Sequence, residues 1–200
     1  MQIQLDPIIL KKQNPFPFYM QTFISILRGI NVSGQKKILM ADLKALYEGL
    51  HFIEVQTYIQ SGNVVFKSDS KLSDIQLAQK IEKAIVAKYN FEVPVIIRSI
   101  EEWKKAIAQN PFTKEKNIDL KKLHITFLSE ITASENVETI KSTDYSPDQF
   151  LIKGKEIYLH TPGGYGNTKL SNIFFEKKLK VMATTRNWNT VNKLSEMASQ

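Results

Sequence analysis

The chain has 200 residues and a formal net charge of +7, and its 42% hydrophobic and 24% charged residues are typical of globular proteins rather than disordered ones. It contains no cysteine, which excludes disulfides, thiolate nucleophiles, zinc fingers and iron–sulfur clusters and fits a reducing cytoplasm. No apolar run approaches the roughly 18 residues of a membrane span and no secretory signal precedes the first apolar group, so we expect a soluble, cytoplasmic protein.

The N-terminal region differs from the rest of the chain. Residues 1–19 carry three prolines and no sustained periodicity, so we expect an arm outside the core, with Met20 as a candidate native first residue. The apolar pattern then predicts strand, helix, two strands joined by a hairpin, helix and strand. These elements are expected at residues 22–27, 40–50, 54–59, 63–67, 74–89 after a Ser73 N-cap, and 93–98.

The same order recurs further along the chain. A linking helix at 100–109 precedes elements expected at residues 122–128, 134–141, 149–152, 157–160, 168–179 and 181–184, and a final helix follows at 188–197. We therefore predict an α+β fold with a duplicated split βαβ arrangement, that is, two ferredoxin-like βαββαβ halves with an extra C-terminal helix. The expected division places the first half at residues 20–99 and the second at 100–200.

Several catalytic patterns are missing from the sequence. The three histidines, His51, His124 and His160, have no metal-ligand spacing, and no G-x-S-x-G elbow surrounds Ser61. No pair of carboxylates stands out as an acid and a base. The strand expected at 63–67 also lacks the aromatic pair that stacks on bases in RNA-recognition modules. No catalytic residue, metal site or cofactor is therefore predicted.

The first candidate binding segment runs from Leu27 to Lys37, where a strand opens into a loop with two glycines. Arg28, Asn31 and Lys36 supply a guanidinium, an amide and an ammonium beside backbone amides that glycine exposes, a combination that holds phosphate. The alternative is an ordinary strand-to-helix connection with solvated lysines.

The second segment, Thr161–Lys169, contains three glycines and leads into a predicted helix. Gly164, Gly166 and Lys169 would present amides and a positive charge to an anion at the helix N-terminus, with Thr168 as the N-cap. The alternative is that the segment is a flexible turn, whose backbone conformation the glycines make sterically accessible.

The third segment, Thr184–Thr190, concentrates planar donors. Arg186 and Asn187 suit a phosphate, a carboxylate or a nucleobase. The alternative assigns Trp188 to the core and the neighbouring Thr and Asn residues to capping of the last helix. The surrounding stretch from Lys153 to Gln200 holds eight basic and three acidic residues, a surplus of +5 that favours polyanionic partners or forms a solvated face.

Three stretches together resemble a known family. They are Leu27–Gly34, Thr57–Phe66, and Lys169–Asn172 continuing to Ala183–Thr190, and their order resembles the bacterial family catalogued as domain of unknown function 1697 from about Met20 to the C-terminus. Ser33 and Ser171 depart slightly from its pattern. The resemblance implies an α+β fold of duplicated ferredoxin-like type and brings no established activity, substrate or catalytic residue.

The sequence thus favours binding of an anionic, phosphate-bearing ligand, with nucleic acid included, provided that the three segments meet in one electropositive recess. An enzyme acting on a small phosphorylated or acidic metabolite is the first alternative, with Tyr165 or a carboxylate handling protons. A homodimeric or partner-binding module is the second. No membrane partner is expected, and the oligomeric state is left open.

Overall fold

The structure is a computed structural model that describes residues 20–32, 34–68 and 72–200. The arm expected at residues 1–19 lies outside the described residues. The described chain forms two four-stranded antiparallel sheets, in the orders β2-β3-β1-β4 and β6-β7-β5-β8, with helices after the first and third strands of each. The predicted α+β fold is confirmed, and β4 lies at the edge of its sheet.

The first sheet and its helices follow the predicted order closely. Ser73 caps α2 as predicted, because its hydroxyl accepts from the Gln76 amide while the Gln76 side chain accepts from the Ser73 amide. The elements are β1 (Gln21–Leu27), α1 (Met40–Gly49), β2 (Ile53–Tyr58), β3 (Asn63–Ser68), α2 (Asp74–Tyr89) and β4 (Val95–Ser99).

The second sheet follows a connecting helix and two short 3-10 turns. The elements are α3 (Ile100–Ala108), η1 (Pro111–Lys114), η2 (Leu120–Lys122), β5 (Leu123–Leu128), α4 (Ser134–Lys141), β6 (Gln149–Lys153), β7 (Glu156–His160), η3 (Tyr165–Asn167), α5 (Asn172–Leu179), β8 (Ala183–Asn187) and α6 (Trp188–Ala198). The largest difference from the predicted starts is at α5, which begins four residues after Thr168, and β4 and β8 each begin two residues later than predicted. Ser171 rather than Thr168 caps α5, because the Ser171 hydroxyl accepts from the Phe174 amide.

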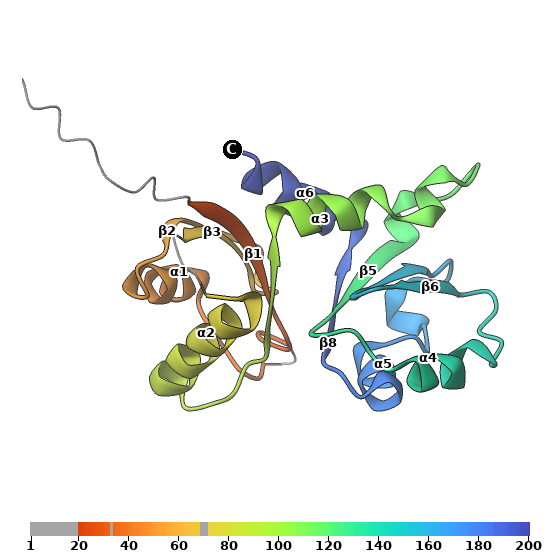
Figure 1. The fold of residues 1–200 in the computed structure, drawn as a ribbon, viewed down its shortest axis with the longest axis horizontal. Helices are drawn as coiled ribbons and strands as arrows, with labels where there is room; N and C mark the ends of the chain where they lie inside the picture. The colour runs from red at the N-terminus through yellow and green to blue at the C-terminus, as the bar shows by residue number, and fades with distance from the viewer. Residues whose placement is uncertain (1–19, 33, 69–71) are drawn as a thin grey trace, which may run out of the picture.

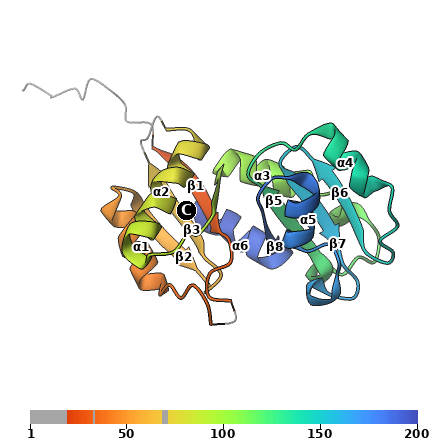
Figure 2. The same cartoon turned by 90° about the horizontal axis from the view of Figure 1, so that it is seen from below.

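The layers are arranged around a shared centre. Figure 1 shows α3 and α6 side by side, bridging the two sheets, and Figure 2 shows α1 and α2 over one sheet and α4 and α5 over the other. Each sheet packs one face on its own pair of helices and the other face on the central layer that contains α3 and α6. The predicted division into residues 20–99 and 100–200 stays a prediction, because this central layer buries residues from both sheets in one cluster.

The two sheets repeat the same strand register. Ile24 on β1 and Ile125 on β5 occupy matching positions, since each pairs with an arginine on the neighbouring edge strand. The residues two positions later, on the same strands, pair with the first residue of β3 and of β7. The matching pairs are Ile24 with Arg98 and Ile125 with Arg186, and Ile26 with Asn63 and Phe127 with Glu156. The edge strands β4 and β8 therefore place Arg98 and Arg186 at equivalent positions, which no run of identical residues had indicated.

The turn at Gly62 is the tightest place that the described residues show for a glycine. Its φ is +74°, and a Cβ there would lie 2.7 Å from Leu27 Cβ and 2.8 Å from Ile30 Cδ1. Gly62→Ala is therefore expected to lower the free energy of unfolding by about 2–3 kcal/mol, through positive-φ strain and overpacking together. Urea denaturation followed by circular dichroism measures the change.

Gly29→Ala is the matched control for that substitution. Gly29 has the same φ of +74° but nothing lies within 4 Å of an added Cβ, so only the backbone strain applies. A loss of about 1 kcal/mol is expected there. Equal losses at Gly29 and Gly62 would show that the close approach to Leu27 has no energetic effect.

Candidate functional site

All three arginines of the chain reach from one sheet unit to the other. Arg98 lies at the edge of the first sheet, and its Nε donates to Glu156 Oε1 at 3.0 Å. Its Nη2 donates to the carbonyl of Leu128 at 2.7 Å, where β5 ends, and its Nη1 donates to the carbonyl of Ile97. These partners compensate the buried charge of Arg98. Because Glu156 and Leu128 belong to the second sheet and Arg98 to the first, the residue connects the two units.

Arg186 makes the reciprocal connection from the second sheet. Its Nη2 donates to the carbonyls of Leu27 and Ser61, both at 2.9 Å, and its Nε donates to Asn63 Oδ1. Its Nη1 donates to Thr184 Oγ1 and to the carbonyl of Thr185. All five N–H groups therefore have acceptors within the protein, and the residue is only 8% exposed.

The burial of Arg186 changes its expected role. No carboxylate lies among its hydrogen-bond partners, and burial lowers its pKa to about 10, so the guanidinium keeps its proton at neutral pH. A ligand has no unused N–H group of Arg186 to bind. The neighbouring Asn187 caps α6 through its Oδ1, which accepts from the Thr190 amide, and Trp188 is buried in the central layer. These contacts match the alternative given for Thr184–Thr190, in which Trp188 belongs to the core and its polar neighbours cap the last helix.

Arg28 forms the third connection and keeps part of its guanidinium available. Its Nε and Nη2 donate to Glu176 Oε1 and Oε2 at 2.8 Å, and both side chains are about a quarter exposed. The hydrogen bonds that Arg28 donates to Glu176 raise the pKa of Arg28. Burial acts to raise the pKa of Glu176, but hydrogen bonds from Arg28 and from the Ala183 amide hold it below its usual value. Both groups are therefore charged at neutral pH.

A concave region beside this pair is defined here as the Arg28 recess. Its volume is about 550 Å³. It is lined by Arg28, Gly29, Val32, Gln35, Lys36, Pro94 and Glu176. Two cationic side chains face one carboxylate in this recess, so it carries a net positive charge from its described lining.

The other residues of the first loop have different surroundings. Asn31 is a structural residue, because its side chain donates to the carbonyls of Ile38 and Gln60 and accepts from the Ile38 amide. Lys36 donates to the carbonyl of Glu92 at 2.7 Å and remains exposed. Of the three predicted contacts in this loop, Arg28 and Lys36 thus line the recess, whereas Asn31 shapes the loop.

The glycine-rich segment forms turns rather than the start of a helix. The Gly164 amide donates to the Thr161 carbonyl, and the Asn167 amide donates to the Gly164 carbonyl. Gly166 and Lys169 are exposed, and no residue of Thr161–Lys169 lines the Arg28 recess. The predicted array of amides at a helix N-terminus is not formed at residue 168, because α5 begins beyond it.

Tyr165 brings this segment into contact with the sheet. Its hydroxyl donates to Thr185 Oγ1 at 2.9 Å, its ring stacks on His124, and burial raises its pKa. Tyr165 also interacts electrostatically with both Arg28 and Arg186. Parts of all three predicted segments therefore meet near Tyr165, whereas Lys169 is not among the described residues that interact with it.

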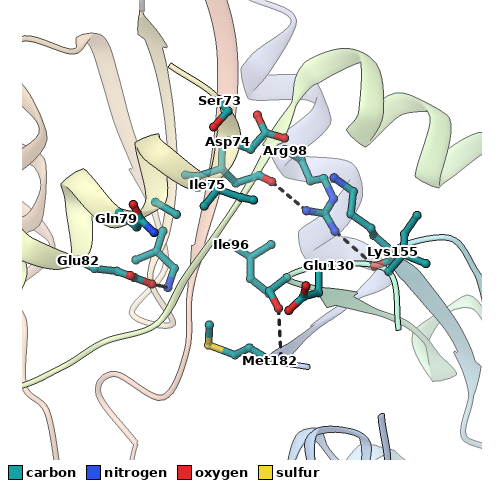
Figure 3. Close-up of a pocket in the computed structure, with 15 residues that line it drawn as sticks. Ser73, Asp74, Ile75, Gln79, Glu82, Ile96, Arg98, Glu130, Lys155 and Met182 are labelled. Carbon is teal, nitrogen blue, oxygen red and sulfur yellow. Dashed lines mark hydrogen bonds between the residues drawn. The ribbon is translucent and has the colours of Figure 1, made fainter. Parts of the chain in front are cut away.

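A second concave region lies between α2 and the second sheet unit and is defined here as the interface cavity. Its volume is about 610 Å³, and Figure 3 shows its lining, with α2 and β4 on one side and residues of the second unit opposite. Charged residues from both units line it: Asp74, Glu82, Arg98, Glu130 and Lys155. The described residues contain no group of three or more His, Cys, Asp or Glu side chains that could hold a metal ion.

Two features of these sites escaped the sequence analysis. Glu176 lies 148 residues from Arg28 in the chain, and no local pattern links the two. The carboxylates of the interface cavity belong to separate elements, and Asp74 and Glu82 look like ordinary polar positions of an amphipathic helix. Gln35 was detectable, because it stands directly before Lys36 in the loop already singled out.

Comparison with known families now identifies the relatives of the chain. The model of the family described as "Protein of unknown function (DUF1697)" matches residues 20–158. The chain belongs to this DUF1697 family. The first two of the three stretches that indicated the family lie inside the matched region and the third lies beyond it.

A solved structure supports the fold assignment. A conserved bacterial protein from Streptococcus pneumoniae, SP0830, is similar with a TM-score of 0.68 and 24% sequence identity, over 90% of this chain and 99% of that protein. At this identity the similarity establishes the fold. No curated protein matches the chain. No helix among the described residues of this DUF1697 protein is long and apolar enough to cross a membrane.

Proposed function

We propose that this DUF1697 protein binds a small anionic, phosphate-bearing ligand in the Arg28 recess. The observation that carries the proposal is the set of donors in one concave region of about 550 Å³. The Nη1 group of Arg28 has no hydrogen-bond acceptor among the described residues, and Gln35 and Lys36 add an amide and an ammonium beside it. Planar and tetrahedral donors together suit a phosphate or carboxylate.

The single carboxylate of the recess does not cancel this set of donors. Glu176 is already engaged by two N–H groups of Arg28 and by the Ala183 amide, which fix its oxygens. The ion pair also orients the guanidinium, so that Nη1 is held in place before a ligand arrives. Such preorganisation lowers the entropic cost of binding.

The shape of the region favours a small ligand over nucleic acid. A duplex or an extended strand needs a continuous basic track with several phosphate contacts. Two of the predicted contacts, Arg186 and Asn31, are instead consumed by hydrogen bonds within the protein, and Lys169 lies outside the recess lining. Fewer cations therefore remain at one place than polyanion binding requires.

Isothermal titration of the full chain with inorganic phosphate and pyrophosphate tests the proposal. Lys36→Ala is expected to weaken pyrophosphate binding by about tenfold, which corresponds to about 1.4 kcal/mol. Lys114→Ala is the control, because Lys114 is an exposed lysine outside the recess lining and its removal changes the net charge equally. Equal effects of the two substitutions would contradict a site at the recess.

A single-stranded oligonucleotide completes the experiment. If it binds with a steep salt dependence that Lys36→Ala and Lys169→Ala reduce alike, the ligand class is nucleic acid and the small-ligand proposal is wrong. If neither phosphate, pyrophosphate nor the oligonucleotide binds at millimolar concentration, anion binding by this recess is wrong altogether.

A further inference from the structure

The basic residues of the interface cavity already have acidic partners. Arg98 Nε lies 3.0 Å from Glu156 Oε1, and Lys155 Nζ lies 3.2 Å from Glu102 Oε1. Neither Glu156 nor Glu102 lines the cavity. The two positive charges of the cavity are therefore paired with carboxylates outside its lining.

Three acidic residues that do line the cavity, Asp74, Glu82 and Glu130, form no ion pair with another described residue. Asp74 shares a side-chain hydrogen bond with Glu102 and interacts electrostatically with Lys155 and Arg98, and Glu82 Oε1 accepts a hydrogen bond from the Val95 amide. The cavity is consequently acidic within its described lining, in contrast to the positive charge of the Arg28 recess. A cleft whose lining carries a net charge concentrates ligands of the opposite sign.

The surroundings of two of these carboxyl groups disfavour their charged form. Burial raises the pKa of Asp74, and Glu102 adds to the effect, outweighing the opposite influence of Lys155 and Arg98. Burial also raises the pKa of Glu82, with Glu92 contributing and the Val95 amide opposing. A cation placed between these groups would relieve both effects.

The positions of the two carboxylates set the length of a complementary ligand. Asp74 and Glu82 are eight residues apart on α2, so the helical rise separates their backbones by about 12 Å. The wall between them is apolar, with Ile75 and Ala78 on α2, and Ile131 faces them from the second unit. Ile75 is 61% exposed and Ile131 is 71% exposed, so both offer apolar surface to a ligand in the cavity.

We propose that the interface cavity binds an aliphatic diamine or polyamine. One ammonium group pairs with Asp74 and another with Glu82, while the hydrocarbon chain packs on the isoleucines between them. Charged ends and an apolar middle distinguish this ligand class from metal ions, which need clustered oxygen ligands, and from anions. Glu130 supplies a third carboxylate at the opposite wall.

Three probes with the same carbon skeleton test the proposal on the full chain. Isothermal titration is carried out with 1,8-diaminooctane, octylamine and 1,8-octanediol. We expect the diamine to bind at least tenfold more tightly than the monoamine, and the monoamine to bind more tightly than the diol. Equal affinities for the diamine and the diol, or no binding of the diamine at 10 mM, would overturn the proposal.

Substitutions locate the site. Asp74→Asn and Glu82→Gln are each expected to reduce diamine affinity to that of octylamine, since each removes one charge. Glu82→Gln keeps an oxygen that accepts from the Val95 amide. Glu135→Gln is the matched control, because Glu135 is exposed on α4 outside the cavity and should leave binding unchanged. A diamine preference that survives the Asp74→Asn/Glu82→Gln double substitution would refute the site.

Two further measurements separate a binding defect from a folding defect. Ile131→Lys adds an ammonium group at an exposed position, so it should keep the fold by circular dichroism and weaken diamine binding at least tenfold. Titration near pH 5 in buffers of different ionisation enthalpy should show proton release on diamine binding, which disappears in Asp74→Asn/Glu82→Gln. Full binding by Ile131→Lys, or no proton release by the unmodified chain, would count against the proposal. Phosphate binding at the Arg28 recess should be unaffected in all of these variants.

Discussion

Arg186→Leu is expected to lower the free energy of unfolding by about 3–5 kcal/mol, among the largest effects of any single substitution in this protein. The substitution leaves the carbonyls of Leu27 and Ser61 and the Asn63 side chain without the donor that the structure shows. These acceptors are remote from Arg186 in the chain, so their loss loosens the junction between the two sheets. Urea denaturation followed by far-UV circular dichroism measures the change.

Two comparisons identify the cause of that loss. Arg186→Lys keeps the positive charge but has fewer donors, so it should fall between the unmodified protein and Arg186→Leu. Lys178→Ala, on an exposed part of α5, should change stability by no more than about 0.5 kcal/mol. If Arg186→Leu unfolds at the same urea concentration as the unmodified protein, Arg186 has no structural role and becomes available as a ligand contact again.

Trp103→Ala is expected to destabilise the protein by about 3–5 kcal/mol, because it removes the largest fully buried side chain of the central layer. The Trp103 ring stacks on Phe127 with centroids 4.5 Å apart. Its Nε1 donates to the carbonyl of Val191 at 2.9 Å, which connects α3 to α6. Thermal and urea unfolding, with Trp188 as the remaining fluorophore, measure the effect.

Trp103→Phe separates packing from hydrogen bonding at this position. Phenylalanine keeps an aromatic ring against Phe127 but removes the indole hydrogen bond to the Val191 carbonyl and part of the buried ring, so a loss of about 1–3 kcal/mol is expected. A cost for Trp103→Ala below about 1 kcal/mol would mean that the central layer relaxes around the missing ring. It would also contradict the view that this layer holds the two sheets together.

The sequence predicted the order of the helices and strands because that order depends on local signals. Hydrophobic periodicity placed α1, α2 and α4 within a residue or two, and the Ser73 capping pattern marked the start of α2. The start of α5 was wrong because Thr168 is a good N-cap type whose hydroxyl instead donates to Asp148. Asp148 precedes Thr168 by 20 residues, so no local sequence pattern connects the two.

The candidate site was predictable only in part. Arg28 and Lys36 were found because a loop rich in glycine and basic residues favours anion binding wherever it occurs. Arg186 had the same local chemistry and a different outcome, since the register of β8 against β5 turns it toward the first unit. Whether an arginine binds a ligand or the protein itself depends on which acceptors the fold brings within reach.

Composition, periodicity and turn residues by themselves determined that this chain is a cysteine-free α+β protein with two β-α-β-β-α-β runs and an extra final helix. The tertiary structure alone decided which polar groups remain available. It consumed Arg98 and Arg186 in reciprocal connections, left part of Arg28 open beside Glu176, and gathered unpaired carboxylates between α2 and the second unit. The physical reason is that burial and pairing of a charge depend on residues far apart in sequence, whereas helix and strand formation depend largely on neighbours.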